Sequence, residues 1–167
     1  MKNLILTMFT ITLLLSSCDT NTPEKTIGFV TGDNAELQWH LGTQEAIDVV
    51  TTVDELWTNQ DYEAMRPYFA DSVKVWRPNG VYTDTFDSFI ESLNNGSNVS
   101  WSYNYAYSVD LDPEIGGEHV QAGFSITYPA TEDSEERVDY QHGSYYVVDG
   151  KIITCLLYTS PSPRDDR

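Results

Sequence analysis

The chain has 167 residues, with 26 acidic and only 9 basic side chains, so its formal net charge is −17 at pH 7. A polypeptide this acidic is repelled by nucleic-acid phosphates and by anionic lipid headgroups, which excludes nucleic-acid binding as its function. The same acidity also fits plain solubility or adaptation to salty water, so it does not by itself identify a partner.

The N-terminus has the features of an export signal. Lys2 is followed by an apolar segment over residues 4–15, two serines and Cys18. About a dozen apolar residues are too few for a membrane-spanning helix, which needs roughly 20. The sequence Leu-Ser-Ser-Cys resembles the lipobox of bacterial lipoproteins, whose cysteine carries acyl chains. The resemblance implies a signal peptide over 1–17, a membrane anchor through lipid on Cys18, and a location in the bacterial cell envelope, at the outer membrane or facing the periplasm. An ordinary secretory signal is the alternative.

The last residues do not continue the pattern before them. Residues 155–165 read CLLYTSPSPRD, which is, residue for residue, the translated end of a common transposase-based sequencing adapter. We therefore predict that residues 155–167 are an adapter artefact and that the last strand is truncated near Thr154. A natural tail rich in proline and serine is the alternative. Without the adapter, Cys18 is the only cysteine, so no disulfide is expected.

Between these ends, the sequence predicts a tether and one domain. Residues 18–40 are polar and contain Pro23, Gly28 and Gly32, which is typical of a flexible linker. Residues 41–154 remain, and about 115 residues is an ordinary size for a single domain.

Helices are predicted in the first half of this domain. Thr43 is the expected N-cap of a helix over 43–59, with Glu45 in the first turn, where the helix dipole favours an anion. Asp61 is expected to cap a second, short helix. Apolar residues with helical spacing support the first helix and predict a third that ends at Asn94-Asn95-Gly96: Ile47, Val50, Val53 and Trp57, then Phe86, Phe89, Ile90 and Leu93.

Strands are predicted elsewhere. Residues 73–77 and 81–83 flank a turn at 78–80, and Asp149-Gly150 is a hairpin turn before a strand that opens at Lys151. Three long strands show a period of two, with these residues on one face: Trp101, Tyr103, Tyr105, Tyr107, Val109 and Leu111; Val120, Ala122, Phe124, Ile126 and Tyr128; Val138, Tyr140, His142, Tyr146 and Val148. This order predicts an α+β fold with helices on one face of a curved antiparallel sheet.

Two segments carry a family resemblance. DYEAMRPYFADSVKVWRPNG, followed by a short strand, a helix and long strands ending in VVDGKI, resembles the nuclear-transport-factor-2-like (NTF2-like) superfamily, and within it the SnoaL-like domains. The resemblance covers residues 41–154. It implies a cone between the sheet and the N-terminal helices, whose mouth often holds a small apolar ligand. The superfamily contains isomerases, dehydratases, cyclases and hydrolases, and also binding and assembly domains, so it does not establish a function.

The steroid isomerases of this superfamily allow a comparison by position. Counting from Ala70-Asp71, their general-base aspartate falls on Arg77, which cannot abstract a proton near neutral pH. Their tyrosine donor falls on Val53. Counting back from Gly150, their second oxyanion donor falls on His142, whose imidazole is able to act as an acid or base. A core histidine bonded to a tyrosine or a carbonyl is the alternative.

We therefore predict a site in the cone that binds a small, partly apolar ligand. Its expected lining is Trp57, Val75, Arg77, Trp101, Tyr103, Tyr105, Phe124, Tyr140 and His142, with His142 the candidate catalytic residue. Tyr140 and Tyr146 are expected to point into the cone beside His142. Arg77 is expected to pair with a ligand carboxylate or with one of the chain's acids. The aromatic row of Trp101, Tyr103, Tyr105 and Tyr107 is expected to lie in the core and to line part of the pocket.

Two alternatives to simple ligand binding remain open. One is a lyase, isomerase or hydrolase that uses His142; the other is a non-catalytic dimer or partner module, because Trp76 has the parity of an outward-facing residue and could enter a homodimer. No cofactor is expected. The spacing of His40, His119 and His142 relative to acidic residues predicts no metal site.

Overall fold

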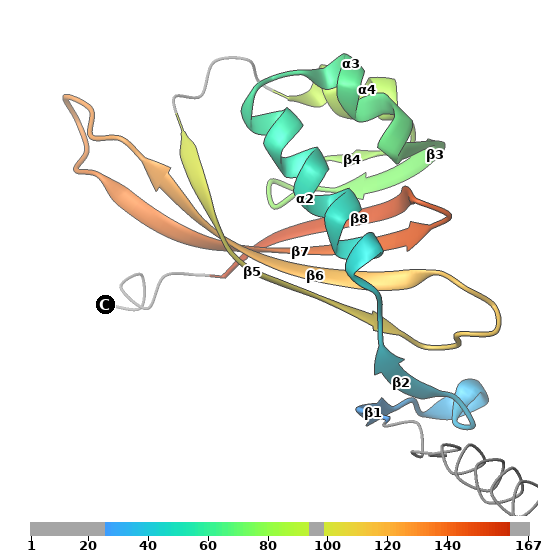
Figure 1. Ribbon diagram of the computed structural model, residues 1–167. Coiled ribbons are helices and arrows are strands. Elements are labelled where there is room, and N and C mark those ends of the chain that lie inside the picture. Colours follow the sequence, from blue (N-terminus) through green and yellow to red (C-terminus); the bar gives the residue numbers. More distant parts are fainter. Residues whose placement is uncertain (1–25, 94–98, 161–167) are drawn as a thin grey trace, which may run out of the picture.

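A computed structural model describes residues 26–93 and 99–160 of the chain. Its helices cover one face of a curved eight-stranded sheet (Figure 1). The strands follow the order β1-β2-β5-β6-β7-β8-β3-β4. Cys18 and the predicted helix stop at 94–96 lie outside the described residues.

Long strands form the centre of the sheet. They are β3 (Phe69–Trp76), β5 (Ser100–Asp110), β6 (Glu118–Tyr128), β7 (Arg137–Val148) and β8 (Lys151–Ser160). Strands β5 to β8 pair antiparallel in chain order, whereas β3 pairs parallel with β8, so the sheet is mixed and not wholly antiparallel as predicted. The parallel pairing arises because the last strand, β8, is inserted between β7 and β3 and runs antiparallel to β7. β4 (Tyr82–Thr83) then pairs with the end of β3.

The helices begin at the residues that the sequence indicates. Helix α2 (Gln44–Thr58) is capped by Thr43, whose side chain accepts a hydrogen bond from the Ala46 amide. Asp61 caps α3 (Tyr62–Met65) through the Ala64 amide. α4 (Phe86–Ser92) begins with a capping box between Thr85 and Ser88. The predicted caps at Thr43 and Asp61 and the predicted third helix are confirmed, whereas the capping box of α4 was not predicted.

The core lies between the helices and the inner face of the sheet. Val50 and Val53 of α2 and Phe89 of α4 are buried against strand residues such as Val75, Val120 and Ile152. Trp76, by contrast, is 39% exposed on the other face, as its parity predicts. Burial of this apolar surface is the main stabilising contribution to the fold.

A β-bulge divides the predicted aromatic row of β5. Tyr103 pairs with Phe124 and Tyr105 pairs with the next residue of β6, Gly123, so Asn104 is an extra residue on β5 without a register partner. Trp101 and Tyr103 face the helices, whereas Tyr105 and Tyr107 lie on the outer face and are 44% and 52% exposed. The prediction of one continuous face is wrong because a bulge reverses the alternation of side chains.

Strand β7 faces opposite to the prediction. Its inward residues are Gly143, Tyr145 and Val147, and the last two are buried in the core. Val138, Tyr140 and His142 do share one face, but it is the outer face of the sheet. The error arose because aromatic residues occur on both faces of this strand, so periodicity alone does not say which face is buried.

Ordered structure also extends beyond the two predicted domain ends. β1 (Gly28–Phe29), a short 3-10 turn (Gly32–Asn34) and β2 (Gln38–Leu41) occupy part of the predicted tether, and β2 pairs with β5 at Val109 and Asp110. β8 continues through the predicted adapter segment, where Cys155 and Leu157 are buried and Leu156 is exposed. Any segment with this alternation of buried and exposed side chains forms such a strand. The structure therefore does not test the prediction that residues 155–167 are an adapter artefact.

Candidate functional site

A half-buried carboxylate joins α2 to the sheet. Asp54 of α2 accepts a hydrogen bond from Nε1 of Trp101 on β5, at 3.0 Å. Burial is the main reason that the pKa of Asp54 is raised; the Trp101 hydrogen bond opposes this and the neighbouring Glu55 charge adds to it. Asp54 is therefore held in surroundings that disfavour its charged form.

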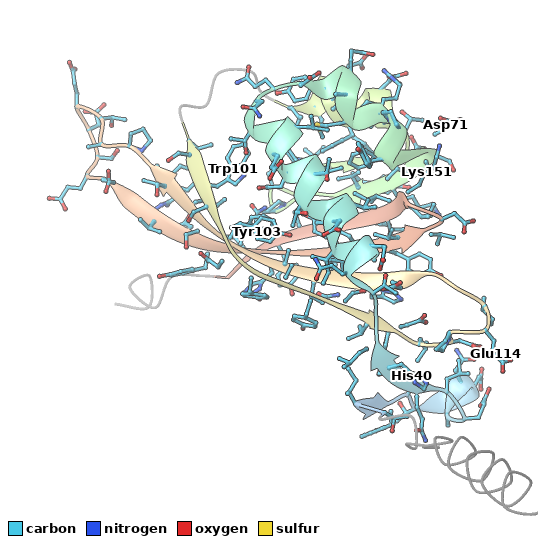
Figure 2. The ribbon with its side chains drawn as sticks, in the orientation of Figure 1. His40, Asp71, Trp101, Tyr103, Glu114 and Lys151 are labelled. Carbon is cyan, nitrogen blue, oxygen red and sulfur yellow. The ribbon has the colours of Figure 1, made fainter. Side chains whose placement is uncertain are left out.

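Tyr103 places a buried hydroxyl on the same inner face. Figure 2 labels Trp101 and Tyr103 on β5, beneath α2. The Tyr103 hydroxyl oxygen is buried and has no hydrogen-bond partner among the described residues. Burial, and after it the charge of Asp54, raises the pKa of Tyr103 to about 12, so the phenol stays protonated at neutral pH. A buried polar group without a partner is uncommon and marks a candidate binding site.

Aromatic rings surround these two polar groups. Trp57 packs edge-to-face on Trp101, with ring centroids 6.2 Å apart, and Tyr103 packs in the same manner on Phe124 at 4.8 Å. Below them lies Tyr145, which is 6% exposed. A Cβ on Gly143 would lie 2.6 Å from the ring carbon Cε2 of Tyr145, so the glycine leaves the space that this ring fills. The site therefore consists of two polar groups, Asp54 and the Tyr103 hydroxyl, surrounded by aromatic rings.

Four of the predicted lining residues thus come together: Trp57, Trp101, Tyr103 and Phe124. Val75 is wholly buried in the core. Arg77 forms no ion pair with an acid among the described residues: its Nη1 donates to the Ser92 carbonyl oxygen at the end of α4, at 2.7 Å. Its partial burial lowers the pKa of Arg77.

The other three predicted residues lie on the outer face. His142 Nδ1 is 2.9 Å from the Tyr105 hydroxyl, and its ring stacks on Tyr158. Tyr140 is 52% exposed on the same side. The alternative prediction was a core histidine bonded to a tyrosine or a carbonyl. His142 does bond to a tyrosine hydroxyl, but on the outer face of the sheet and not in the core. His142 is separated from Asp54 and Tyr103 by the sheet itself.

Sequence reasoning missed Asp54, although a signal was present. Val50, Val53 and Trp57 mark the buried stripe of α2, and Asp54 lies between them, four residues after Val50 and three before Trp57. Those spacings place it beside the stripe and facing the sheet. An acid in this position is a candidate site residue because a buried carboxylate is costly without a partner.

Two hollows lie at the ends of the sheet. One of about 590 Å³ is lined by the β6–β7 hairpin, including Tyr128 and Arg137, and by Val99, two residues before Trp101. Tyr128 is two residues beyond Ile126, the cross-strand partner of Trp101. The other hollow, of about 390 Å³, is lined by residues such as His40 and Glu114 (Figure 2). Neither of these hollows is lined by Asp54 or Tyr103.

Glu118 fixes the position of the helix that carries Asp54. Its carboxylate accepts hydrogen bonds from the Thr43 amide and the Ser108 hydroxyl, both at 2.6 Å, and from the Thr43 hydroxyl at 2.7 Å. Burial raises the pKa of Glu118, but the three hydrogen bonds outweigh it and the pKa lies below its ordinary value. A Cβ at Gly42 would collide with Ser108 and Glu118, so only glycine fits there.

The outer face of the sheet carries aromatic and neutral polar side chains. We define the outer patch as Trp76, Tyr105, Tyr107, Gln121, Tyr140, His142 and Ser144. Tyr105 and Tyr107 stack nearly parallel, and Gln121 donates to Ser144. No position of the patch is acidic, although the chain contains 26 acidic residues.

Two negative findings apply to residues 26–93 and 99–160. No helix in these ranges is long and apolar enough to cross a membrane. The same residues contain no group of three or more His, Cys, Asp or Glu side chains placed to hold a metal ion.

No protein-family model matches the sequence, and comparison with curated proteins found no match. Solved structures do match. An NTF2-like protein of unknown function from Cytophaga hutchinsonii is 12% identical at a TM-score of 0.52, over 72% of this chain and 94% of its own. An LEH-like epoxide hydrolase from M. tuberculosis is 12% identical (TM-score 0.53; 71% and 84% covered). The CaMKII hub of S. rosetta is 11% identical (TM-score 0.57; 70% and 95% covered). The protein therefore has the NTF2-like fold, as its sequence pattern predicted.

Proposed function

We propose that this protein is a lipid-anchored envelope protein whose NTF2-like domain binds a small, partly apolar ligand on the inner face of its sheet. Tyr103 and Asp54 are its polar contacts, and Trp57, Trp101 and Phe124 its apolar ones. The observation that carries the proposal is the buried Tyr103 hydroxyl without a partner, which a ligand carbonyl or hydroxyl would satisfy.

The proposed route of ligand entry is the unpaired edge of β5 beside Trp101. β5 pairs with β2 only at residues 109 and 110, so its outer edge beside Trp101 has no strand partner among the described residues. Trp101 is only partly buried, and we propose that a ligand enters past its ring to reach the Tyr103 hydroxyl. The 590 Å³ hollow adjoins the same end of the strand and is of a size typical for small-ligand sites.

Replacing Tyr103 with phenylalanine is expected to separate stability from binding. The free energy of unfolding should rise by about 1 kcal/mol, because a buried hydroxyl without a partner is removed. The affinity for 2-acetylnaphthalene, an apolar ketone, should fall by about 3- to 10-fold, because the hydrogen bond to its carbonyl is lost. Chemical denaturation and isothermal titration calorimetry measure the two quantities.

Tyr107→Phe is the matched control, since it removes the same hydroxyl from the outer face. It should change neither quantity. If Tyr103→Phe leaves the affinity unchanged, or if the wild-type chain does not bind the ketone, the proposed site is wrong.

The anchor is tested at Cys18. In a bacterial host fed an alkyne-labelled fatty acid, the wild-type chain should become labelled and sediment with membranes. Cys18→Ser should abolish the labelling and release the protein, because the acyl chains proposed to hold it at the membrane are attached to Cys18. Ser17→Ala keeps a small residue before the cysteine and should behave like the wild type. Unlabelled wild type, or a labelled Cys18→Ser variant, would contradict the anchor.

A second candidate function is self-association through the outer patch. Two copies of a chain with a net charge of −17 repel one another, and a contact face without carboxylates keeps that repulsion lowest. Large exposed aromatic side chains favour association once such a face is paired. The patch as defined excludes Leu156 and Tyr158, but Leu156 of β8 lies between Trp76 and Ser144, so the continuity of the patch from β7 to β3 depends on the segment predicted to be adapter.

A further inference from the structure

We infer that the ligand of the inner-face site is a cation: an apolar molecule carrying a protonated amine, held between Asp54 and the rings of Trp57 and Trp101. This inference rests on the proposed function and adds the charge of the ligand to it. Three observations support it, concerning the carboxylate, its lack of a counter-ion and the aromatic surroundings.

The first observation is an available carboxylate oxygen. Among the residues that the structure describes, only Oδ1 of Asp54 has a hydrogen-bond partner, the indole of Trp101. Oδ2 is not among the fully buried polar atoms that lack a partner, so it keeps contact with solvent. An ammonium group that reaches Asp54 would therefore meet an oxygen free to accept a hydrogen bond.

The second observation is that this carboxylate has no counter-ion within the described part of the chain. Each arginine there bonds elsewhere: Arg66 to Asp87 and Glu63, Arg77 to the Ser92 carbonyl, and Arg137 to Asp139. Lys74 and Lys151, the lysines of the described ranges, form no ion pair with Asp54. A partly buried charge without an opposite charge is destabilising, and a cationic ligand would remove that cost.

The third observation is the pair of indole rings beside the carboxylate. Trp57 is three residues after Asp54 on the same helix, and its ring meets that of Trp101 at an interplanar angle of 71°. Two rings at this angle present differently oriented faces to one bound group. Tryptophan faces attract ammonium ions most strongly among the aromatic side chains. The net charge of −17 further raises the local concentration of cations.

The test compares two probes of nearly equal shape, 2-naphthylmethylammonium and 2-naphthylmethanol, on the full chain at constant ionic strength. Calorimetry should show the ammonium binding about 10-fold more tightly than the alcohol. Asp54→Asn keeps the shape and an acceptor for Trp101 but removes the charge, so it should abolish this preference by weakening ammonium binding about 10-fold more than alcohol binding.

Glu55→Gln is the matched control, because it removes one charge from the adjacent, exposed position of α2 and should keep the preference intact. If the alcohol binds as tightly as the ammonium, or if Glu55→Gln abolishes the preference as fully as Asp54→Asn, the inference is overturned while the proposed function stands. If neither probe nor the ketone binds, the proposed function fails with it.

Discussion

Glu118→Ala is expected to lower the free energy of unfolding by about 3 kcal/mol, because three hydrogen bonds to one partly buried carboxylate are lost together. Two of them hold Thr43, the N-cap of α2, and the third holds Ser108 on β5. The loss therefore detaches the start of the helix that carries Asp54. Urea denaturation followed by circular dichroism measures the change.

The contribution of Glu118 should also depend on pH. Its pKa in the folded protein lies below the ordinary value of 4.5, so the folded state favours the ionised form. The stabilisation is complete above pH 4.5 and is lost as pH falls through the folded pKa. The stability difference between wild type and Glu118→Gln should accordingly stay constant near neutral pH and shrink below pH 4.5.

Glu114→Ala is the control for this prediction. Glu114 is an exposed acid on the loop that precedes β6 (Figure 2), and its side chain bonds no described residue. Its replacement should change stability by less than about 0.5 kcal/mol. An equal effect of the two variants, or a difference that grows toward low pH, would show that the hydrogen bonds of Glu118 do not anchor α2.

Tyr107→Asp is expected to convert a self-associated protein into a monomer. Tyr107 is 52% exposed on β5, at one side of the outer patch, next to Tyr105. A carboxylate there would be desolvated in a paired interface and would face its own copy, which costs several kcal/mol for like charges. Light scattering coupled to size-exclusion chromatography should give a dimer mass for the wild type and a monomer mass for the variant.

Ile115→Asp provides the comparison. Ile115 is 78% exposed, but it lies on the loop between β5 and β6, outside the patch. This variant adds the same charge and removes a similar amount of exposed apolar surface, so its mass should match that of the wild type. A wild type that stays monomeric at all concentrations, or a dimer that survives Tyr107→Asp, would exclude the outer patch as the interface.

The sequence alone determined most of the local structure and the fold. Thr43, Asp61 and the Asp149-Gly150 turn act through hydrogen bonds and backbone preferences within a few residues, and Asp149 and Gly150 do adopt the positive φ angles such a turn requires. The order of elements then restricts the fold, because helices followed by long antiparallel strands have few ways to bury one common face. The order of elements predicted only the α+β layout, and the NTF2-like prediction rested on the resemblance of residues 61–80 and of VVDGKI to that superfamily.

The tertiary structure alone decided which residues form the site. The bulge at Asn104 turned Tyr105 outward while keeping Tyr103 inside, and pairing with β6 and β8 set His142 outside and Tyr145 inside. Both outcomes depend on register, and a shift of one residue exchanges the two faces of a strand without changing its pattern. Asp54 became a site residue only when Trp101, 47 positions later, came within hydrogen-bond distance. Local sequence patterns carry no information about such contacts, because these are set by how distant elements pack.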